Sequence, residues 1–149
     1  MPHDGHHKCM ASALAQAEQT CAVAGLRFTP LRRQVFEVIW QSHKAMTAMD
    51  VLSALGKEAQ PPTAYRALGF LQQHGLVHYV ASLNAYVGCV CPGQDHTGQL
   101  LICTQCRDVA EVDVTPLANT LSQQAAKQGF RVAHNHIELL GTCKKCQQN

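Results

Sequence analysis

Apolar residues recur at helical spacing in several separate segments of the first half of the chain. The first segment covers residues 12–24 and stops at Gly25. The second opens with Thr29, a favourable N-cap, and Pro30 at the first helical position, and its apolar residues recur every three or four positions until Ser42. The spacing therefore predicts two amphipathic helices in succession.

Two further helices are predicted before the chain changes its pattern. Thr47 and Asp50, three residues apart, form a variant capping box that opens a short helix ending at Gly56. A pair of prolines then interrupts the chain, and Thr63 is expected to cap a fourth helix that runs toward Gly75.

After Gly75 the pattern favours strands. Residues 76–80 and 85–89 predict two strands, and residues 82–84 predict the turn between them. Helices followed by a β-hairpin are the order of a winged helix-turn-helix, in which the helix after the turn enters the major groove by its N-terminal residues. The candidate DNA contacts are therefore Thr63, Tyr65 and Arg66. A half-buried tyrosine and a solvated arginine would explain the same pattern equally well.

A break at residues 91–93, Cys-Pro-Gly, predicts a domain boundary. Beyond it, residues 99–103 and 109–114 predict strands, a helix starts at Thr115, and residues 130–140 predict a long final strand.

The expected fold class is α+β, with an N-terminal winged helix and a C-terminal α/β dimerisation domain. The expected divisions are a DNA-binding domain over residues 1–90, with a disordered tail at 1–11, a hinge at 91–97, and a dimerisation and zinc-binding domain at 98–149. The last domain is too small to bury much core, so a metal and a second copy of the chain would have to stabilise it.

Two Cys-x-x-Cys pairs, separated by 36 residues, supply the metal ligands in that domain. Each pair places two sulfurs on one tight turn, and two such pairs complete a tetrahedral four-sulfur shell that is closed to water and therefore structural. The predicted structural zinc ligands are Cys103, Cys106, Cys143 and Cys146.

Composition supports metal chemistry for these thiols. The chain has 149 residues and eight cysteines, and its first ten residues contain no apolar signal-peptide core. We therefore expect a cytoplasmic protein, in which cysteine clusters bind metal or exchange electrons and do not form structural disulfides. The net charge of +2 arises wholly within residues 1–90, which is compatible with a partner rich in phosphate but too small to establish one.

Four further ligand-type residues flank the predicted hinge. His78 and Cys89 precede it, while His96 lies at its end and Glu111 follows it. No local spacing joins them, and each alone is explained by an ordinary surface or core role. Because two lie on the hairpin side and two on the far side, a shared metal ion would tie the two domains together.

Several segments together resemble the ferric uptake regulator superfamily, and in particular its zinc-responsive members. They are PPTAYRALGFLQQHGLVH, the hairpin residues 84–87, HTGQLLICTQC and the terminal GTCKKC. The resemblance implies a homodimeric, zinc-activated repressor that binds palindromic operator DNA and controls zinc uptake genes. It implies about two zinc ions per protomer, the structural one and a regulatory one held by His78, Cys89, His96 and Glu111. One thiolate with two imidazoles and a carboxylate suits zinc better than manganese or ferrous iron.

Other readings predict different chemistry. Iron-, manganese- and peroxide-sensing regulators of the same superfamily are the nearest alternative. A thiol-redox protein would also use Cys-x-x-Cys, but it would not hold zinc tightly. A zinc deaminase would need a proline immediately before the second cysteine pair, where Thr142 stands, and an open coordination position for water. The sequence contains no defensible catalytic constellation, so we expect a protein that is not an enzyme.

Overall fold

The computed structural model describes residues 6–42, 44–56, 59–89, 99–112, 115–133 and 135–148, with side chains from Met10 onward. The chain divides into two compact units, Met1–Gln94 and Asp95–Asn149. The predicted hinge at 91–97, which contains His96, lies outside the described residues. Among the residues described, no helix combines the length and the apolar character needed to cross a membrane.

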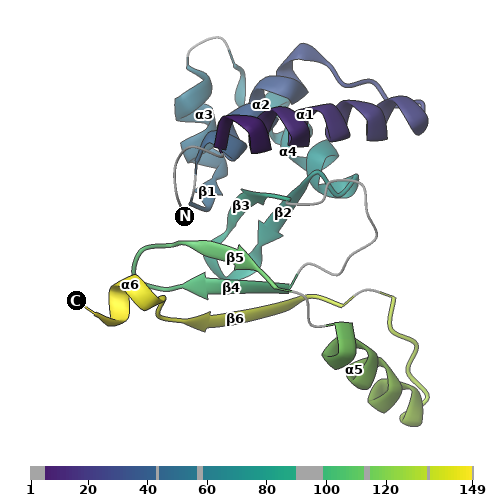
Figure 1. Cartoon of the computed structure of the whole chain (residues 1–149). Coiled ribbons are helices and arrows are strands. Elements are labelled where there is room, and N and C mark those ends of the chain that lie inside the picture. The colour runs from purple at the N-terminus through teal and green to yellow at the C-terminus, as the bar shows by residue number, and fades with distance from the viewer. Residues whose placement is uncertain are drawn as a thin grey trace. The chain divides into compact units, whose positions relative to one another are not determined.

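The first unit has the topology of a winged helix (Figure 1). Its small antiparallel sheet has the order β1-β3-β2, so the hairpin is joined by a short strand that the sequence analysis did not predict. In chain order the elements are α1 (His6–Val23), α2 (Pro30–Gln41), β1 (Met46–Thr47), α3 (Ala48–Leu55), α4 (Pro61–Gln73), β2 (Val77–Val80), the 3-10 turn η2 (Ala81–Leu83) and β3 (Ala85–Gly88).

Local capping explains where α2 and α3 begin. The Thr29 hydroxyl accepts a hydrogen bond from the Arg32 N–H at 3.3 Å. At α3 the Asp50 N–H donates to the Thr47 hydroxyl at 3.1 Å, and the Thr47 N–H donates to the Asp50 carboxylate at 2.8 Å. Both predicted caps are therefore confirmed, including the reciprocal capping box.

Two predicted helix starts are wrong. Helix α1 begins at His6, so the predicted tail at 1–11 is helical from that residue onward. No proline or glycine stands between His6 and the buried Ala13, and a helix held by packing at Ala13 can extend back to His6. Helix α4 begins at Pro61, and Thr63 is its third residue rather than its cap. Proline is favourable in the first turn of a helix, because its fixed φ is already helical and its missing N–H needs no partner there.

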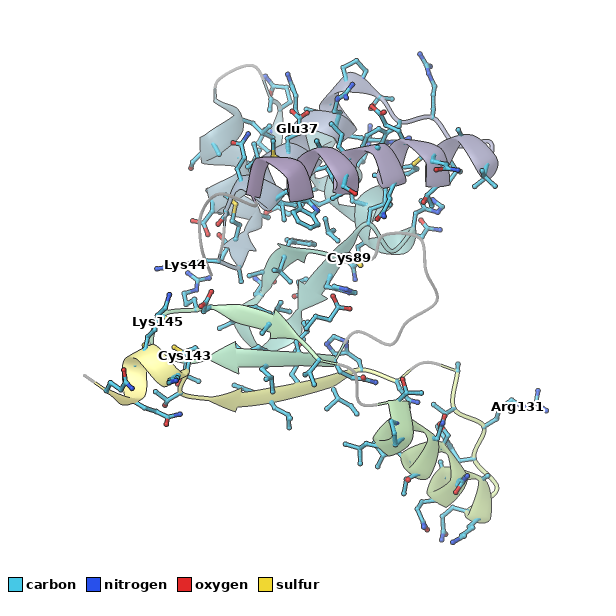
Figure 2. The ribbon with its side chains drawn as sticks, in the orientation of Figure 1. Glu37, Lys44, Cys89, Arg131, Cys143 and Lys145 are labelled. Carbon is cyan, nitrogen blue, oxygen red and sulfur yellow. The ribbon has the colours of Figure 1, made fainter. Side chains whose placement is uncertain are left out.

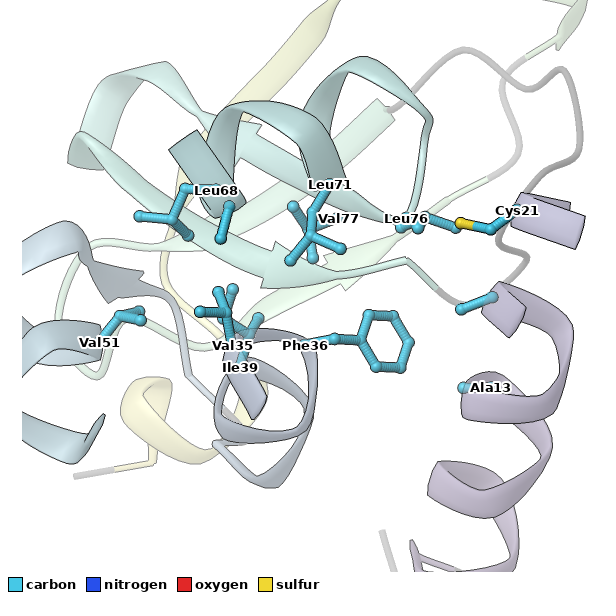
Figure 3. Close-up of a cluster of buried hydrophobic side chains, with 12 residues drawn as sticks. Ala13, Cys21, Val35, Phe36, Ile39, Val51, Leu68, Leu71, Leu76 and Val77 are labelled. Carbon is cyan, nitrogen blue, oxygen red and sulfur yellow. The ribbon is translucent and has the colours of Figure 1, made fainter. Parts of the chain in front are cut away.

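The core of the first unit lies between its helices and its sheet (Figure 3). Phe36 is fully buried and makes an edge-on contact with Phe28, their ring centroids 6.3 Å apart. Helix α4 contributes Leu68 and Leu71 to the same cluster, so one face of α4 is committed to packing. The other fully buried side chains of this cluster, in order of decreasing size, include Ile39, Leu76, Val35, Val51, Val77 and Cys21.

The second unit contains a three-stranded sheet of order β5-β4-β6. Strand β4 pairs antiparallel with β5 and parallel with β6. Its elements are β4 (Gln99–Cys103), β5 (Val109–Glu111), α5 (Thr115–Lys127), β6 (Ile137–Gly141) and the short helix α6 (Lys144–Gln147).

The final strand is shorter than predicted, because its pairing partner is short. The five residues of β6 pair one to one with the five residues of β4. Before β6, the Asn135 side-chain amide donates to the Ser122 hydroxyl at 3.2 Å and to the Ala118 carbonyl at 3.5 Å. These bonds tie the preceding segment to α5, so the prediction of a strand over 130–140 is wrong for its first half.

Candidate metal centre and DNA-binding surface

The two Cys-x-x-Cys turns meet at one end of the second sheet. Cys103 is the last residue of β4, and the Arg107 N–H closes the first turn by donating to the Cys103 carbonyl at 3.0 Å. Arg107 itself has a φ of 62°, a left-handed conformation that lets the chain reverse immediately after Cys106. Cys143 precedes α6 (Figure 2). The Gln147 N–H donates to the Cys143 carbonyl at 3.0 Å.

Strand pairing brings the two turns together. Cys103 lies opposite Gly141 in the parallel pairing of β4 with β6. The Thr104 N–H donates to the Gly141 carbonyl at 2.9 Å, and the Thr104 hydroxyl donates to the same oxygen at 3.2 Å. The first cysteine turn is therefore fixed to the chain two residues before Cys143.

The sulfur positions fit a tetrahedral zinc ion. The four sulfurs of Cys103, Cys106, Cys143 and Cys146 lie within 4.8 Å of one another. Those of Cys106 and Cys143 are 3.7 Å apart. Zinc–sulfur bonds of about 2.3 Å in a tetrahedron require an edge of about 3.8 Å. A zinc ion held by these four thiolates would be closed to water and would cross-link the end of β4 to the C-terminal segment.

Backbone N–H groups prepare one of these sulfurs for ionisation. The pKa of Cys103 is lowered to about 6, because its sulfur accepts hydrogen bonds from the backbone N–H of Cys106 and then from that of Cys143. The second bond measures 3.4 Å. The pKa of Cys146 is raised to about 12, chiefly by its thiol hydrogen bond to Cys143 and further by burial. Without a cation the cluster thus favours a thiolate at Cys103 and a thiol at Cys146, and a bound metal would displace the proton of Cys146.

Two predicted regulatory ligands lie together in the first unit. His78 on β2 pairs opposite Val87 of β3. Cys89 follows β3, is fully buried, and donates its N–H to the Leu76 carbonyl at 3.4 Å. The Cys89 sulfur and a His78 ring nitrogen lie within 4.8 Å of one another, so both could bind one ion.

Of the other two predicted regulatory ligands, one belongs to the second unit and the other is not among the described residues. Glu111 is the last residue of β5 in the second unit, where it pairs opposite Leu100 and is half-buried. His96 lies outside the described residues.

The predicted DNA contacts share the solvent-facing side of α4. Thr63, Tyr65 and Arg66 are exposed, whereas Ala64 and Ala67 are buried. The backbone at the start of α4 offers no spare N–H for a phosphate, because two prolines have none and the next two N–H groups donate to the Gln60 carbonyl at 3.1 Å. Any contact with DNA here would be made by side chains.

One residue beside the hairpin was not identified from the sequence. The ring of Trp40, in the last turn of α2, lies against Gly88 immediately before Cys89. No spacing rule connects positions so far apart in the chain. The one available signal was a glycine in a predicted strand, which often marks the close approach of a large side chain such as the single tryptophan.

Comparison with known proteins agrees with this architecture. The model of the ferric uptake regulator family matches residues 23–140. The zinc uptake regulation protein of Escherichia coli (strain K12) is 41% identical over 137 residues, which cover 89% of this chain and 80% of that protein. The peroxide operon regulator of Bacillus subtilis (strain 168) is 28% identical over 141 residues, which cover 93% of this chain and 96% of that protein.

Among solved structures, a zinc uptake regulator complexed with zinc and DNA matches with a TM-score of 0.87 at 38% identity, covering 93% of this chain and 95% of that one. A winged helix followed by a small sheet unit with a four-cysteine cluster defines a class of metal-binding winged-helix proteins. Within that class, the chain belongs to the ferric uptake regulator family.

Proposed function

We propose that this chain is a zinc-responsive transcriptional repressor that binds palindromic operator DNA as a zinc-loaded homodimer and controls zinc uptake genes. The observation that carries the proposal is its similarity, over 93% of its length, to a zinc uptake regulator solved with zinc and DNA. The lower identity to a peroxide regulator, 28% against 41%, favours zinc sensing over the alternative within the family.

Helix α4 supplies the proposed reading surface. Arg66 and Tyr65 project from its first two turns, and Tyr65 is 51% exposed although aromatic side chains usually seek burial. In a winged helix these positions face the base edges of the major groove, where arginine can form a forked pair with guanine and tyrosine can contact a thymine methyl group. Thr63, one turn earlier, would contact a phosphate through its hydroxyl.

The proposed regulatory zinc ion is bound by His78, Cys89, His96 and Glu111. Support comes from the first pair, because a buried thiol beside an imidazole is a donor set that zinc prefers. With the four-cysteine site, the expected content is about two zinc ions per protomer. The structural ion stabilises the fold, and the regulatory ion responds to the free zinc concentration.

Zinc would act on DNA affinity by selecting one arrangement of the two domains. If the DNA-competent arrangement rises from roughly 1% of molecules to nearly all of them, the apparent affinity improves about a hundredfold, or ~2.7 kcal/mol. By thermodynamic reciprocity, bound DNA should strengthen binding of the regulatory zinc by the same factor.

Exposed leucines in the second unit support the homodimer. Leu101 of β4 lies directly opposite Leu139 of β6, and the two are 43% and 51% exposed. Leu117 and Leu121, one turn apart on α5, are each 46% exposed. Neighbouring apolar side chains of this kind are typical of a surface that a second copy covers.

The decisive experiment measures zinc content and operator binding in the same samples. Cys89→Ser should lose one zinc ion per protomer and its zinc-dependent operator binding while remaining a folded dimer. Cys21→Ser is a matched control, because Cys21 is also a buried cysteine of the first unit but belongs to no ligand cluster in the described part of the chain. If Cys89→Ser retained full zinc-dependent operator binding, the regulatory-site assignment would be wrong. Titration with manganese and ferrous iron tests the alternative within the family.

A further inference from the structure

The tryptophan of α2 occupies the space that a side chain at Gly88 would need. A Cβ atom built on Gly88 would lie 2.8 Å from Cε2 and Nε1 of Trp40, and 3.0 Å from Cδ1. Non-bonded carbon atoms prefer about 3.5–4.0 Å, so any residue other than glycine would force the ring or the strand to move by about 0.7 Å or more. The pyrrole edge of the indole thus packs directly on the backbone of β3.

The contact between Trp40 and Gly88 lies at the end of β3, immediately before Cys89. Gly88 is the last residue of the strand and pairs with Val77 of β2. The next N–H in the chain, that of Cys89, donates to the Leu76 carbonyl. The segment leading to the Cys89 sulfur is therefore held by β2 through hydrogen bonds and by Trp40 through packing.

Within the described part of the chain, the Trp40 ring is held by packing. The Trp40 Nε1–H is buried and has no hydrogen-bond partner among the described residues. The ring instead contacts Phe36, with the ring centroids 6.1 Å apart, and joins the edge of the core cluster. A buried donor without an acceptor costs free energy, so the indole position follows from how the neighbouring side chains and Gly88 pack.

We propose that Trp40 is a positioning residue for Cys89, because its ring sets the location of the end of β3 and hence the position of the Cys89 sulfur for zinc binding. The inference rests on the proposed function, in which Cys89 is a regulatory zinc ligand. Helix α2 packs on α4 through the core, and through Trp40 it also contacts the backbone beside Cys89. Trp40 is also the single tryptophan of the sequence, so its fluorescence reports on this contact without labelling.

The test is a pair of complementary substitutions in the full-length protein. Gly88→Ala introduces the close contact, and Trp40→Leu removes the pyrrole edge that supports the strand. Each should weaken binding of the regulatory zinc at least tenfold, as substitutions around metal ligands commonly do, with the four-cysteine zinc retained. Combining them should restore the affinity to within about threefold of the wild type, because the added methyl group fills part of the vacated space. Zinc affinity is measured by competition with a chromophoric chelator.

A purely structural contact would give a different result. It would change the melting temperature of the first unit in the single variants and leave their zinc affinity unchanged, and that outcome would overturn the proposal. Gly69→Ala is the matched control, since it adds the same methyl group to the same unit with nothing within 4 Å. If Gly88→Ala fails to fold, Trp40→Leu alone decides, because it creates no clash.

Fluorescence gives an independent readout in the wild-type protein. The emission of Trp40 should change as the regulatory zinc binds, and the change should be absent in Cys89→Ser. No change on binding of that ion would count against the positioning role. If Cys89→Ser still binds the second zinc ion, the regulatory-site assignment in the proposed function fails. If Cys89→Ser loses that ion while Gly88→Ala and Trp40→Leu bind it normally, only the present inference fails.

Discussion

Removal of one sulfur from the four-cysteine cluster should destabilise the second unit and leave the first unit folded. Cys146→Ser is the preferred change, because Cys146 lies on the short helix α6 and is only partly buried, whereas Cys103 is also a buried residue of β4. We expect the variant to lose the structural zinc ion. The second unit should then lose its cooperative unfolding, and the dimer should dissociate.

The magnitude follows from how little the second unit buries. Among its described residues, Leu100 and Ile102 are the large aliphatic side chains with almost no exposure. Together they contribute about 3–6 kcal/mol, at roughly 1.5–3 kcal/mol for each fully buried aliphatic side chain. Structural zinc sites of this type contribute apparent binding free energies of about 10–16 kcal/mol. The ion is therefore the larger contribution, and the apolar core cannot replace it.

Calorimetry, zinc analysis and sedimentation of the same preparation test this reasoning. The wild type should show stabilisation of the second unit that a strong chelator removes slowly, and Cys146→Ser should lack it. The first unit should keep its helical circular dichroism and its own transition, because its core contains none of the four cysteines. The reasoning is refuted if Cys146→Ser remains a dimer with an unchanged transition in the second unit after its zinc has been lost.

Three further outcomes are expected. Arg66→Ala should weaken operator binding by about 1–3 kcal/mol if the arginine contacts guanine. If the arginine binds the DNA backbone, the substitution should instead reduce the salt dependence of binding by about one phosphate contact. Gel-shift titrations across salt concentrations distinguish the two outcomes, and the zinc content should be unchanged in both. Leu139→Asp should yield monomers by analytical ultracentrifugation, whereas the same change at the exposed Gln123 of α5 should not. In the metal-free chain, the Cys103 pKa of about 6 lies below its ordinary value of 9.0. The folding stability that the Cys103 thiolate contributes is therefore complete above pH 9 and is lost as the pH falls through 6. Thiolate absorbance should fall over the same lower pH range, and this change should be absent in Cys103→Ser.

Much of the first unit could be predicted from the sequence, because its signals act over three or four residues. The Thr29 cap and the Thr47–Asp50 capping box were identified this way. The error at Thr63 arose where two local signals competed, since a hydroxyl residue and two prolines all favour a helix start. Proline in the first turn prevailed, and the helix started three residues earlier than a Thr63 cap would place it.

The candidate sites were predicted to different depths. The four cysteines carry their geometry in two local turns, so their role could be inferred before their sulfurs were seen to lie within 4.8 Å of one another. His78 and Cys89 have no such spacing, and only their positions beside the predicted hinge and the resemblance to a family pointed to them. The proximity of His78 and Cys89 depends on the register of β2 against β3. That register places His78 opposite Val87 and Val77 opposite Gly88, so that Cys89 follows directly beside β2.

The sequence by itself determined the order of the main helices and strands, most helix ends and the two Cys-x-x-Cys turns, since each depends on residues close together in the chain. The tertiary structure alone decided that β1 joins the hairpin sheet, that β6 is only as long as its partner β4, and that Trp40 packs on Gly88. Strand pairing and side-chain packing join residues that are distant in sequence, and their energies depend on shape and register. The part of this protein proposed to position the sensing thiolate therefore becomes visible only after folding.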